Sequence, residues 1–303
     1  MGRLGRMVAL VVVAVTLVTG SLSVSSAGQL DDAMLAYDVG DYATALRLLH
    51  PLAEKGTPHA QYSLGVMYRE GRGVVQDAVK ATIWYQRAAA QGHDSAQYNL
   101  GIMFENGEGV TQDQAEAMKW YLMAAKQGGA DAQFSVGRMY ENGTGITKDD
   151  GKAAIWYRKA ARQGFAAALY NLGGLYRAGR GVAQDQSEAA KLWRNAAKLG
   201  YAPAQNNLGY LYREGEGVVQ DHAEALNWYR MAALQHHALA QRNLGKMYYK
   251  GVGVAKDFVE AYKWFSIASD NKGRSLAASQ MNSAQIAKAH ILAREWMTKH
   301  PRK

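Results

Sequence analysis

The chain has 303 residues, of which 48% are hydrophobic, and its formal net charge at pH 7 is +9. It contains no cysteine, which excludes disulfide bonds, a thiol nucleophile, cysteine-ligated metals and lipid attachment at an N-terminal cysteine. Glycine is abundant and proline scarce, a composition that favours helices joined by glycine turns over a disordered linker protein.

The N-terminus has the pattern of a secretory signal peptide. Arg3 and Arg6 precede an apolar stretch over 8–18, and the small residues Ser25 and Ala27 suit a cleavage site. The apolar stretch is shorter than the roughly 20 residues that span a bilayer. We therefore expect cleavage after Ala27 and export to the periplasm, with no stable membrane span in the mature protein. Secretion and an uncleaved signal anchor remain alternatives.

An alanine recurs every 36 residues and opens six copies of one pattern. The second copy reads A-Q-Y-N-L-G-I-M-F-E-N-G-E-G-V from Ala96. A fixed period of this length is typical of a solenoid, in which each repeat packs only against its neighbours. Such an array presents a long surface, which favours a binding scaffold. The six alanines are Ala60, Ala96, Ala132, Ala168, Ala204 and Ala240.

The first half of each copy predicts an amphipathic helix, called helix A here. In the second copy Ala96, Leu100, Met103 and Phe104 form one apolar stripe at helical spacing. Gly101 lies in the middle of that helix, where glycine costs about 1 kcal/mol relative to alanine. Because the same glycine recurs in all six copies, we predict that a large aromatic ring approaches the backbone there.

The second half of each copy predicts a helix B that packs against helix A. Asp113 stands at its start, where an aspartate caps exposed backbone amides. Glu116, three residues later, predicts a reciprocal capping box, and Glu188, Glu224 and Glu260 are its equivalents. The aromatic pair Trp120-Tyr121 lies next to alanines along the same helix face.

The predicted fold is all-α, a right-handed solenoid of 36-residue antiparallel helix pairs. A signal peptide over 1–27 precedes a lead-in helix pair over 28–59, and a C-terminal capping helix and tail occupy 273–303. The six repeats are expected over 60–95, 96–131, 132–167, 168–203, 204–239 and 240–272.

The repeat pattern, with its glycine pair, aspartate, Trp-Tyr and paired alanines, resembles the Sel1-like repeat, a relative of the tetratricopeptide repeat. The resemblance covers 60–272 and implies an α-solenoid that serves as an adaptor. Two departures affect local geometry: Leu192-Trp193 replaces the Trp-Tyr pair in the fourth copy, and His236 stands where the fifth copy should close with glycine.

The residues do not indicate an enzyme. The Gly-x-Gly pairs follow a helix rather than a strand, which makes them turns and not phosphate loops. Ser269 to Lys272 spells two β-lactamase motifs in one overlapping tetrapeptide, whereas enzymes use separate segments. His236 and His237 lack a zinc spacing. We therefore expect no catalytic residue, no cofactor and no metal.

The face of helix A outside its apolar stripe is the predicted partner surface. In the first four repeats it carries a ring at the third position, and the last repeat carries a basic row at helical spacing, suited to carboxylates. Packing between repeats is the alternative role for the rings, and solvation the alternative for the basic row. The predicted binding residues are Tyr62, Tyr98, Phe134, Tyr170, Tyr210, Arg242, Lys246 and Lys250.

From these features we expect a non-catalytic adaptor of the cell envelope that binds a protein or peptide in the concave groove, with an acidic partner where the basic row takes part. A cell-wall polysaccharide is a competing ligand, favoured by the rings and the positive charge. A peptidoglycan- or β-lactam-active enzyme using Ser269 is the third class. Export argues against nucleic acid as a partner.

Overall fold

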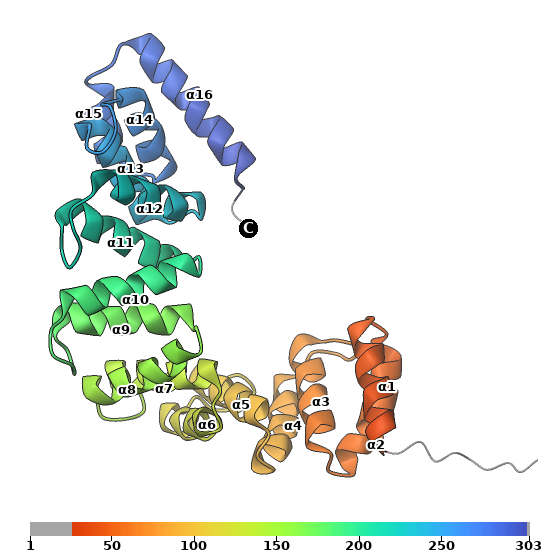
Figure 1. Ribbon diagram of the computed structural model, residues 1–303. Helices are drawn as coiled ribbons and strands as arrows, with labels where there is room; N and C mark the ends of the chain where they lie inside the picture. The colour runs from red at the N-terminus through yellow and green to blue at the C-terminus, as the bar shows by residue number, and fades with distance from the viewer. Residues whose placement is uncertain (1–25, 302–303) are drawn as a thin grey trace, which may run out of the picture.

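The computed structural model describes residues 26–301, and this part of the chain folds into sixteen α-helices without a β-strand. Figure 1 shows them stacked along a curved path. The predicted all-helical solenoid of helix pairs is confirmed. The helices are α1 (Ser26–Asp38), α2 (Tyr42–Glu54), α3 (Pro58–Glu70), α4 (Ala78–Ala90), α5 (Asp94–Asn106), α6 (Gln114–Lys126), α7 (Ala130–Asn142), α8 (Asp150–Arg162), α9 (Ala166–Ala178), α10 (Gln186–Lys198), α11 (Ala202–Glu214), α12 (His222–Leu234), α13 (Ala238–Lys250), α14 (Phe258–Ile267), α15 (Asn271–Ala278) and α16 (Ser283–Lys299).

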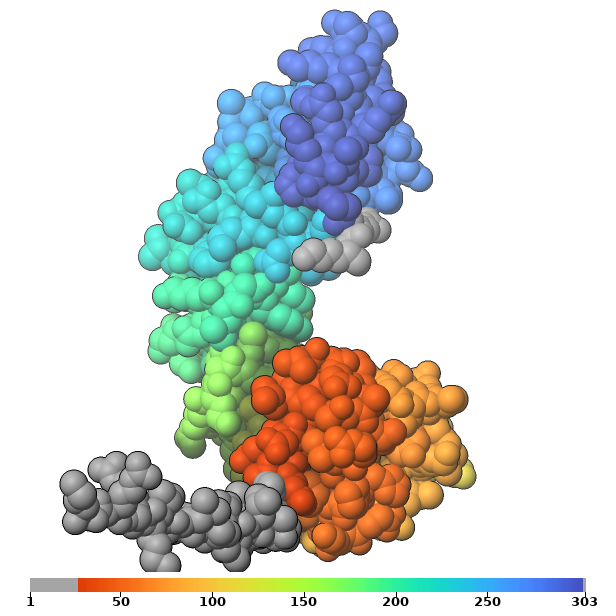
Figure 2. Space-filling model, turned by 90° about the vertical axis from the view of Figure 1, so that its right-hand side faces the viewer, coloured from red at the N-terminus to blue at the C-terminus, as the bar shows by residue number. Residues whose placement is uncertain are grey.

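Odd-numbered helices from α3 to α13 are the A helices, and even-numbered helices from α4 to α14 are the B helices. Each A helix packs against the B helix of its own repeat and against the even-numbered helix that precedes it, which is α2 for the first repeat. At the C-terminal end α15 packs against α14 and α13, and α16 packs along α14. In Figure 2 α16 covers the upper end of the molecule, and α1 to α4 project at the lower end.

The predicted signal peptide lies outside the described residues, except for its last two positions in the first turn of α1. Helices α1 and α2 pack against each other before the first repeat, and α2 also packs against α3. Within residues 26–301, no helix has the length and apolar character needed to cross a bilayer.

The glycine in the middle of each A helix has the packing role predicted for it. A Cβ atom added at Gly65 would lie 2.5 Å from Cδ1 of Tyr85, a ring on the paired B helix. An equivalent ring covers the equivalent glycine of each later repeat. It is a tyrosine in the second, third and fifth repeats, Trp193 over Gly173 in the fourth and Phe265 over Gly245 in the sixth. The Leu192-Trp193 departure therefore preserves the contact, because Trp193 takes the place of the tyrosine.

The aspartates before the B helices are N-caps, as predicted. Asp113 accepts hydrogen bonds from the backbone amides of Ala115 and Glu116. The reciprocal half of the predicted capping box is wrong, because the amide of Asp113 already donates to the Phe104 carbonyl oxygen over 2.9 Å. Glu116 instead pairs with Lys119 at 2.7 Å.

His236 keeps the turn that a glycine closes in other repeats. Its φ angle is 61°, in the left-handed region that Gly92, Gly128, Gly164 and Gly200 occupy at the equivalent positions. Histidine adopts this conformation more readily than most side chains, but the conformation still costs free energy relative to glycine. Its ring lies 5.3 Å from that of Trp296 in α16, a contact that glycine could not make.

A second set of contacts, the glutamine ladder, joins consecutive repeats. Gln61 donates from Nε2 to the buried carbonyl oxygen of Ala53 (2.9 Å), and Gln91 of the next turn donates to Oε1 of Gln61 (2.7 Å). The pattern satisfies a buried backbone acceptor and a buried side chain together. It recurs in the pairs Gln97/Gln127, Gln133/Gln163 and Gln205/Gln235.

Candidate functional site

The predicted aromatic residues lie one per repeat along the A helices and are half-buried. Tyr98 lies 5.6 Å from the ring of Tyr121, and Tyr170 stacks on Trp193 at 6.2 Å. Tyr62 and Phe134 make the corresponding contacts with the B-helix rings of their repeats. Among the described ring contacts, none joins one of these four residues to another. Each ring therefore takes part in packing within its repeat while keeping an exposed edge.

The B-helix tyrosines beneath these rings are held neutral. Burial raises the pKa of Tyr121 far above its usual value, and a 2.7 Å hydrogen bond to Glu105 adds to this effect. Tyr229 is the equivalent B-helix tyrosine of the fifth repeat, where none of these four rings lies, and burial raises its pKa to about 12. Neutral phenols of this kind donate hydrogen bonds but do not act as bases near neutral pH.

Charged residues on the A helices of the first five repeats are joined in pairs across repeat boundaries. Each pair links an A helix to the next A helix or to the turn that follows it. These groups are partly exposed, so each pair contributes at most about 1 kcal/mol, but their charges cancel locally. The pairs are Arg69–Glu108 (3.1 Å), Glu105–Arg138 (2.6 Å), Glu141–Arg180 and Arg177–Glu216 (3.0 Å).

This pairing stops at α13, where the predicted basic row lies. Arg242 is paired with Asp270 at 3.3 Å. Lys246 and Lys250 are exposed, and neither makes an ion pair or hydrogen bond with any described residue. Lys272, at the start of α15, is also unpaired within residues 26–301. Two of the predicted cations and one additional cation are thus left without an internal counter-charge.

These three lysines line one hollow, called the basic pocket here, with a volume of ≈ 800 Å³. Its apolar lining includes Met247 of α13 and Phe265 of α14. The helix α15 contributes Lys272 and Gly273, which belong to its first turn. Backbone amides without intrahelical partners gather in such a turn and favour an anion nearby.

The net charge of the basic pocket is positive. Besides the three lysines, its charged lining consists of the pairs Arg213–Glu214 (2.6 Å) and Arg242–Asp270. A hollow with an apolar lining and unpaired cations at its edge suits a ligand that carries both carboxylates and an apolar side chain.

Tyr210, the fifth predicted aromatic residue, differs from the first four. Tyr210 has no B-helix ring against it among the described contacts; its hydroxyl donates to Glu216 over 2.9 Å. The guanidinium groups of Arg177 and Arg213 lie 5.1 Å and 5.4 Å from its ring centre. Tyr210 therefore belongs to the charged surface between the fourth and fifth repeats.

Comparison with known proteins identifies the repeat. A family model described as Sel1 repeat matches residues 58–93, 94–129, 130–165, 166–201, 202–237 and 238–272. The chain belongs to the Sel1 repeat family. The resemblance predicted from the sequence is confirmed, and each matched Sel1 repeat begins two residues before its predicted alanine.

Two solved Sel1-type structures are similar over most of the chain. A Sel1 repeat protein from Oxalobacter formigenes is 32% identical, with a TM-score of 0.73, over 79% of this chain and 96% of that one. The protein c5321, described as a protective antigen of uropathogenic Escherichia coli with an SLR fold, is 31% identical. Its TM-score is 0.60, over 91% of this chain and 69% of that one. No curated protein matches the chain.

A further hollow of the Sel1 array, called the central cleft here, lies between the fourth and fifth repeats. Its volume is ≈ 650 Å³, and Asn171 and Gly174 of α9 and Asn207 of α11 contribute to its lining. The predicted ring of Tyr170 lies on its border. The cleft and the basic pocket thus share α11, which lines both.

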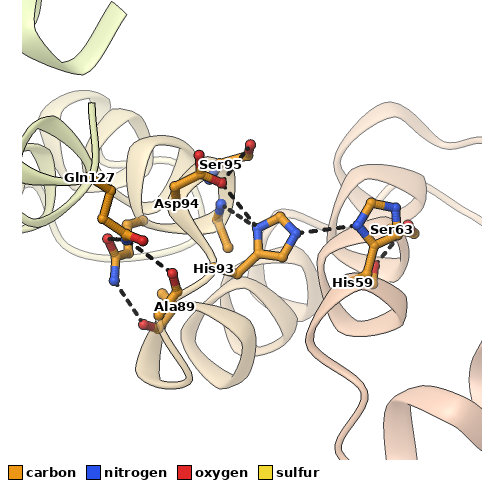
Figure 3. Close-up of polar contacts among 10 residues, drawn as sticks. His59, Ser63, Ala89, His93, Asp94, Ser95 and Gln127 are labelled. Atoms are coloured by element: carbon orange, nitrogen blue, oxygen red, sulfur yellow. Dashed lines mark hydrogen bonds and ion pairs between the residues drawn. The ribbon is translucent and has the colours of Figure 1, made fainter. Parts of the chain in front are cut away.

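A histidine pair joins α3 to the N-terminus of α5 (Figure 3). His93 is the N-cap of α5, where its Nδ1 accepts from the amide of Ala96 at 3.3 Å, and its Nε2 lies 3.4 Å from Nδ1 of His59. Burial lowers the pKa of His93. The sequence analysis missed this pair. No group of three or more metal-ligating side chains is found in the described part of the chain.

Ser269 lies in a turn of the Sel1 array rather than in a site. It is exposed, has a φ angle of 55°, and its side chain makes no hydrogen bond with a described residue. Asp270, the next residue, caps α15 by accepting from the amide of Gly273 at 3.0 Å. Both β-lactamase-like motifs therefore coincide with the turn that connects α14 to α15.

Proposed function

We propose that this chain is a non-catalytic adaptor that holds an acidic segment of a partner protein in the basic pocket. The Sel1 repeat fold is commonly a protein-interaction scaffold, and the proposal adds the site and the charge of the partner. The observation that carries it is the end of the ion-pair series at α13. There Lys246, Lys250 and Lys272 border one hollow without an internal counter-charge.

The electrostatics of the pocket favour carboxylates over other ligands. A lysine that pairs with a carboxylate gains a charge-assisted hydrogen bond, worth about 1.5–3 kcal/mol in a partly desolvated site. Three lysines from two helices can be satisfied together by a segment with alternating acidic and apolar residues. Such a segment also buries apolar surface against Met247 and Phe265.

Support for a protein partner over a polysaccharide comes from the rings. A sugar stacks on an open aromatic face, but the rings of Tyr98 and Tyr170 lie against Tyr121 and Trp193 of their own repeats. Support for a non-catalytic role comes from Ser269, whose side chain makes no hydrogen bond with a described residue, and from the neutral tyrosines.

The proposed location is the bacterial cell envelope. It rests on the signal-peptide pattern of the first 27 residues, and one solved relative is described as a protective antigen. Intact-mass measurement of the exported protein tests it. A mature chain that begins at Gly28 supports export with cleavage, whereas an intact leader in the membrane fraction supports an anchor.

The adaptor function is tested by photo-crosslinking in envelope extracts, with the crosslinker placed at Tyr249 on the pocket lining. The native chain should yield a defined crosslinked protein, and the Lys246→Glu variant should lose it. Lys126→Glu, on the exposed end of α6 and remote from the pocket, is the matched charge control and should retain it. Equal crosslinking by all three proteins would contradict the proposed site.

A further inference from the structure

Gly174 in the middle of α9 has no packing reason to be glycine. A Cβ atom added there would meet no heavy atom within 4 Å, whereas a Cβ at the neighbouring Gly173 would lie 2.6 Å from Nε1 of Trp193. Glycine weakens a helix interior relative to alanine, so Gly174 carries a penalty that the fold does not require. The other repeats have side chains at this position, namely Val66, Ile102, Arg138, Tyr210 and Lys246.

The effect of this glycine is to leave the central cleft open. Gly174 lines the cleft together with Asn171 on its own helix and Asn207 on the next A helix. Any of the side chains found in the other repeats would extend into that space. Glycine is characteristic of places where the backbone of the protein and a ligand approach closely.

The charges around the cleft are already paired. Arg177 pairs with Glu216 at 3.0 Å, and Arg180 pairs with Glu141. An ionic ligand would have to break one of these pairs, since no unpaired charged side chain lines the cleft in the described structure. The cleft therefore favours a neutral polar ligand, in contrast to the basic pocket.

The neutral groups that remain are side-chain amides with unused capacity. Asn171 donates from Nδ2 to the Tyr157 hydroxyl over 3.0 Å, which leaves its Oδ1 to accept. Asn207 accepts at Oδ1 from Asn206 over 3.3 Å, which leaves its Nδ2 to donate. Oε1 of Gln186, which also lines the cleft, is buried without a hydrogen-bond partner in the described structure.

These groups match a peptide backbone. Each peptide unit presents one N–H donor and one C=O acceptor, the complement of the Asn171 oxygen and the Asn207 amide. A sugar would need an open ring face, but Trp193 is only 3% exposed and Tyr170 stacks on it. An extended peptide can also approach Gly174 more closely than a folded surface can.

We propose that the central cleft binds the backbone of a neutral, extended peptide segment, which continues into the acidic segment held by the basic pocket. The proposal rests on the proposed function and adds a second contact with the same partner. α11 connects the two sites, because it contributes Asn207 to the cleft and Arg213 to the pocket. In this arrangement the cleft fixes the path of the partner's backbone, and the pocket selects its charge.

The test uses fluorescent synthetic peptides and the full mature chain. The long probe joins a neutral Ser/Thr/Ala half to an acidic Asp/Glu/Leu half, in both orders, and has about twelve residues, enough to extend over about 40 Å. The short probe is the acidic half alone. Gly174→Ile fills the cleft, and Asn195→Ile places the same side chain on an exposed position of α10 outside it. Circular dichroism and thermal unfolding verify that each variant folds.

In one order, the long probe should bind the native chain more tightly than the short probe. Gly174→Ile should lower the affinity for the long probe on the order of tenfold and leave the affinity for the short probe unchanged. Asn195→Ile should affect neither. Gly174→Ala should raise the Tm by about 2 °C, because the glycine is not needed for packing.

Two results would overturn the inference. One is equal affinity of the long probe for the native chain and Gly174→Ile. The other is binding of peptidoglycan sacculi that Gly174→Ile abolishes while peptide binding persists. If one of these results occurs while Lys246→Glu still weakens binding of the short probe, the inference fails but the proposed function stands. Failure of both probes to bind the native chain would contradict the proposed function as well.

Discussion

Gln127 donates from Nε2 to Oε1 of Gln97 over 2.8 Å, and this bond joins the end of helix B to helix A of the same repeat. Gln97 in turn donates to the buried carbonyl oxygen of Ala89 over 3.1 Å. In the fourth repeat both equivalent positions carry leucine, Leu169 and Leu199. The fourth repeat thus replaces both glutamines of a ladder step, and in the repeats that keep both, the hydrogen bond between them couples the two side chains.

We therefore expect non-additive stability effects at this step. Gln97→Leu should reduce the free energy of unfolding by about 0.5–1.5 kcal/mol, because it removes a buried hydrogen bond to the Ala89 carbonyl, which then accepts only from backbone amides such as that of Gly92. Adding Gln127→Leu should cost less than Gln127→Leu does alone, with a coupling energy of at least about 0.5 kcal/mol. Chemical denaturation of the two single variants and the double variant measures it. Strict additivity would show that the glutamines act independently.

The packing glycines should respond to alanine in the opposite way to Gly174. A Cβ at Gly101 would lie 2.6 Å from the ring of Tyr121, which is buried and cannot move away freely. Gly101→Ala should lower the free energy of unfolding by about 1–3 kcal/mol, despite the better helix propensity of alanine. Thermal unfolding of Gly101→Ala beside Gly174→Ala makes the comparison. A stabilising effect at Gly101 would contradict the packing role.

Acidification should weaken the fold through two histidine caps. Nδ1 of His93 and Nδ1 of His237 each accept from a backbone amide at 3.3 Å, which a protonated ring nitrogen cannot do. Burial lowers the pKa of both; nearby His59 lowers that of His93 further, and Asp94 opposes the shift. The folded state therefore binds protons less readily than the unfolded state. This stability is present above about pH 6.5 and is lost as the pH falls through the lowered values.

The measurement is the midpoint of urea unfolding as a function of pH. The double variant His93→Asn, His237→Asn keeps a side chain that caps helices well but does not titrate. Its midpoint should change less between neutral and mildly acidic pH than that of the native chain. We compare the change of the midpoint with pH between the two proteins and not the midpoint itself. His93 also stacks on Tyr62 at 4.6 Å, so its replacement can shift the midpoint at every pH. Identical slopes would assign the pH dependence to other groups.

Ser269 should be replaceable by glycine with a gain in stability. Its φ angle of 55° favours glycine, and its exposed side chain makes no hydrogen bond with a described residue. Relief of the strain should exceed the added flexibility of the unfolded chain, with a net gain of up to about 1 kcal/mol. Mass spectrometry after incubation with a β-lactam gives the second readout. Acylation that is lost in Ser269→Gly would support the enzyme alternative.

The period and the local chemistry of the repeat were enough to predict the fold. The approach of an aromatic ring to Gly101 could be predicted, because a mid-helix glycine repeated in every copy implies a close contact. Only the structure shows that the ring is Tyr121 and not its neighbour Trp120. The aspartate N-caps could also be predicted, because a cap depends only on the residues that follow it in the sequence. The return bond from Glu116 was not predictable, because the amide of Asp113 is taken by Phe104, nine residues earlier and in the other helix.

Less of the site could be predicted. The spacing of Lys246 and Lys250 placed them on one helix face, but the wall opposite them is α15, a short helix that departs from the repeat. Lys272 therefore joins the pocket only through the fold. The ion-pair partners of the charged residues could not be predicted either. The pairing of Arg242 with Asp270, for example, depends on how the turn between α14 and α15 packs. The open space at Gly174 was missed because its neighbour Gly173 is a packing glycine.

The central claim is that the unpaired lysines of the basic pocket hold carboxylates, and the affinity of the acidic probe as a function of salt tests it most directly. For the native chain, binding should weaken as salt rises, because screening acts on partly exposed charges. Lys246→Glu should bind at least about tenfold more weakly with a shallower salt dependence and an unchanged Tm, while Lys126→Glu should behave like the native chain. An affinity and a salt dependence that are unaffected by Lys246→Glu would contradict the account.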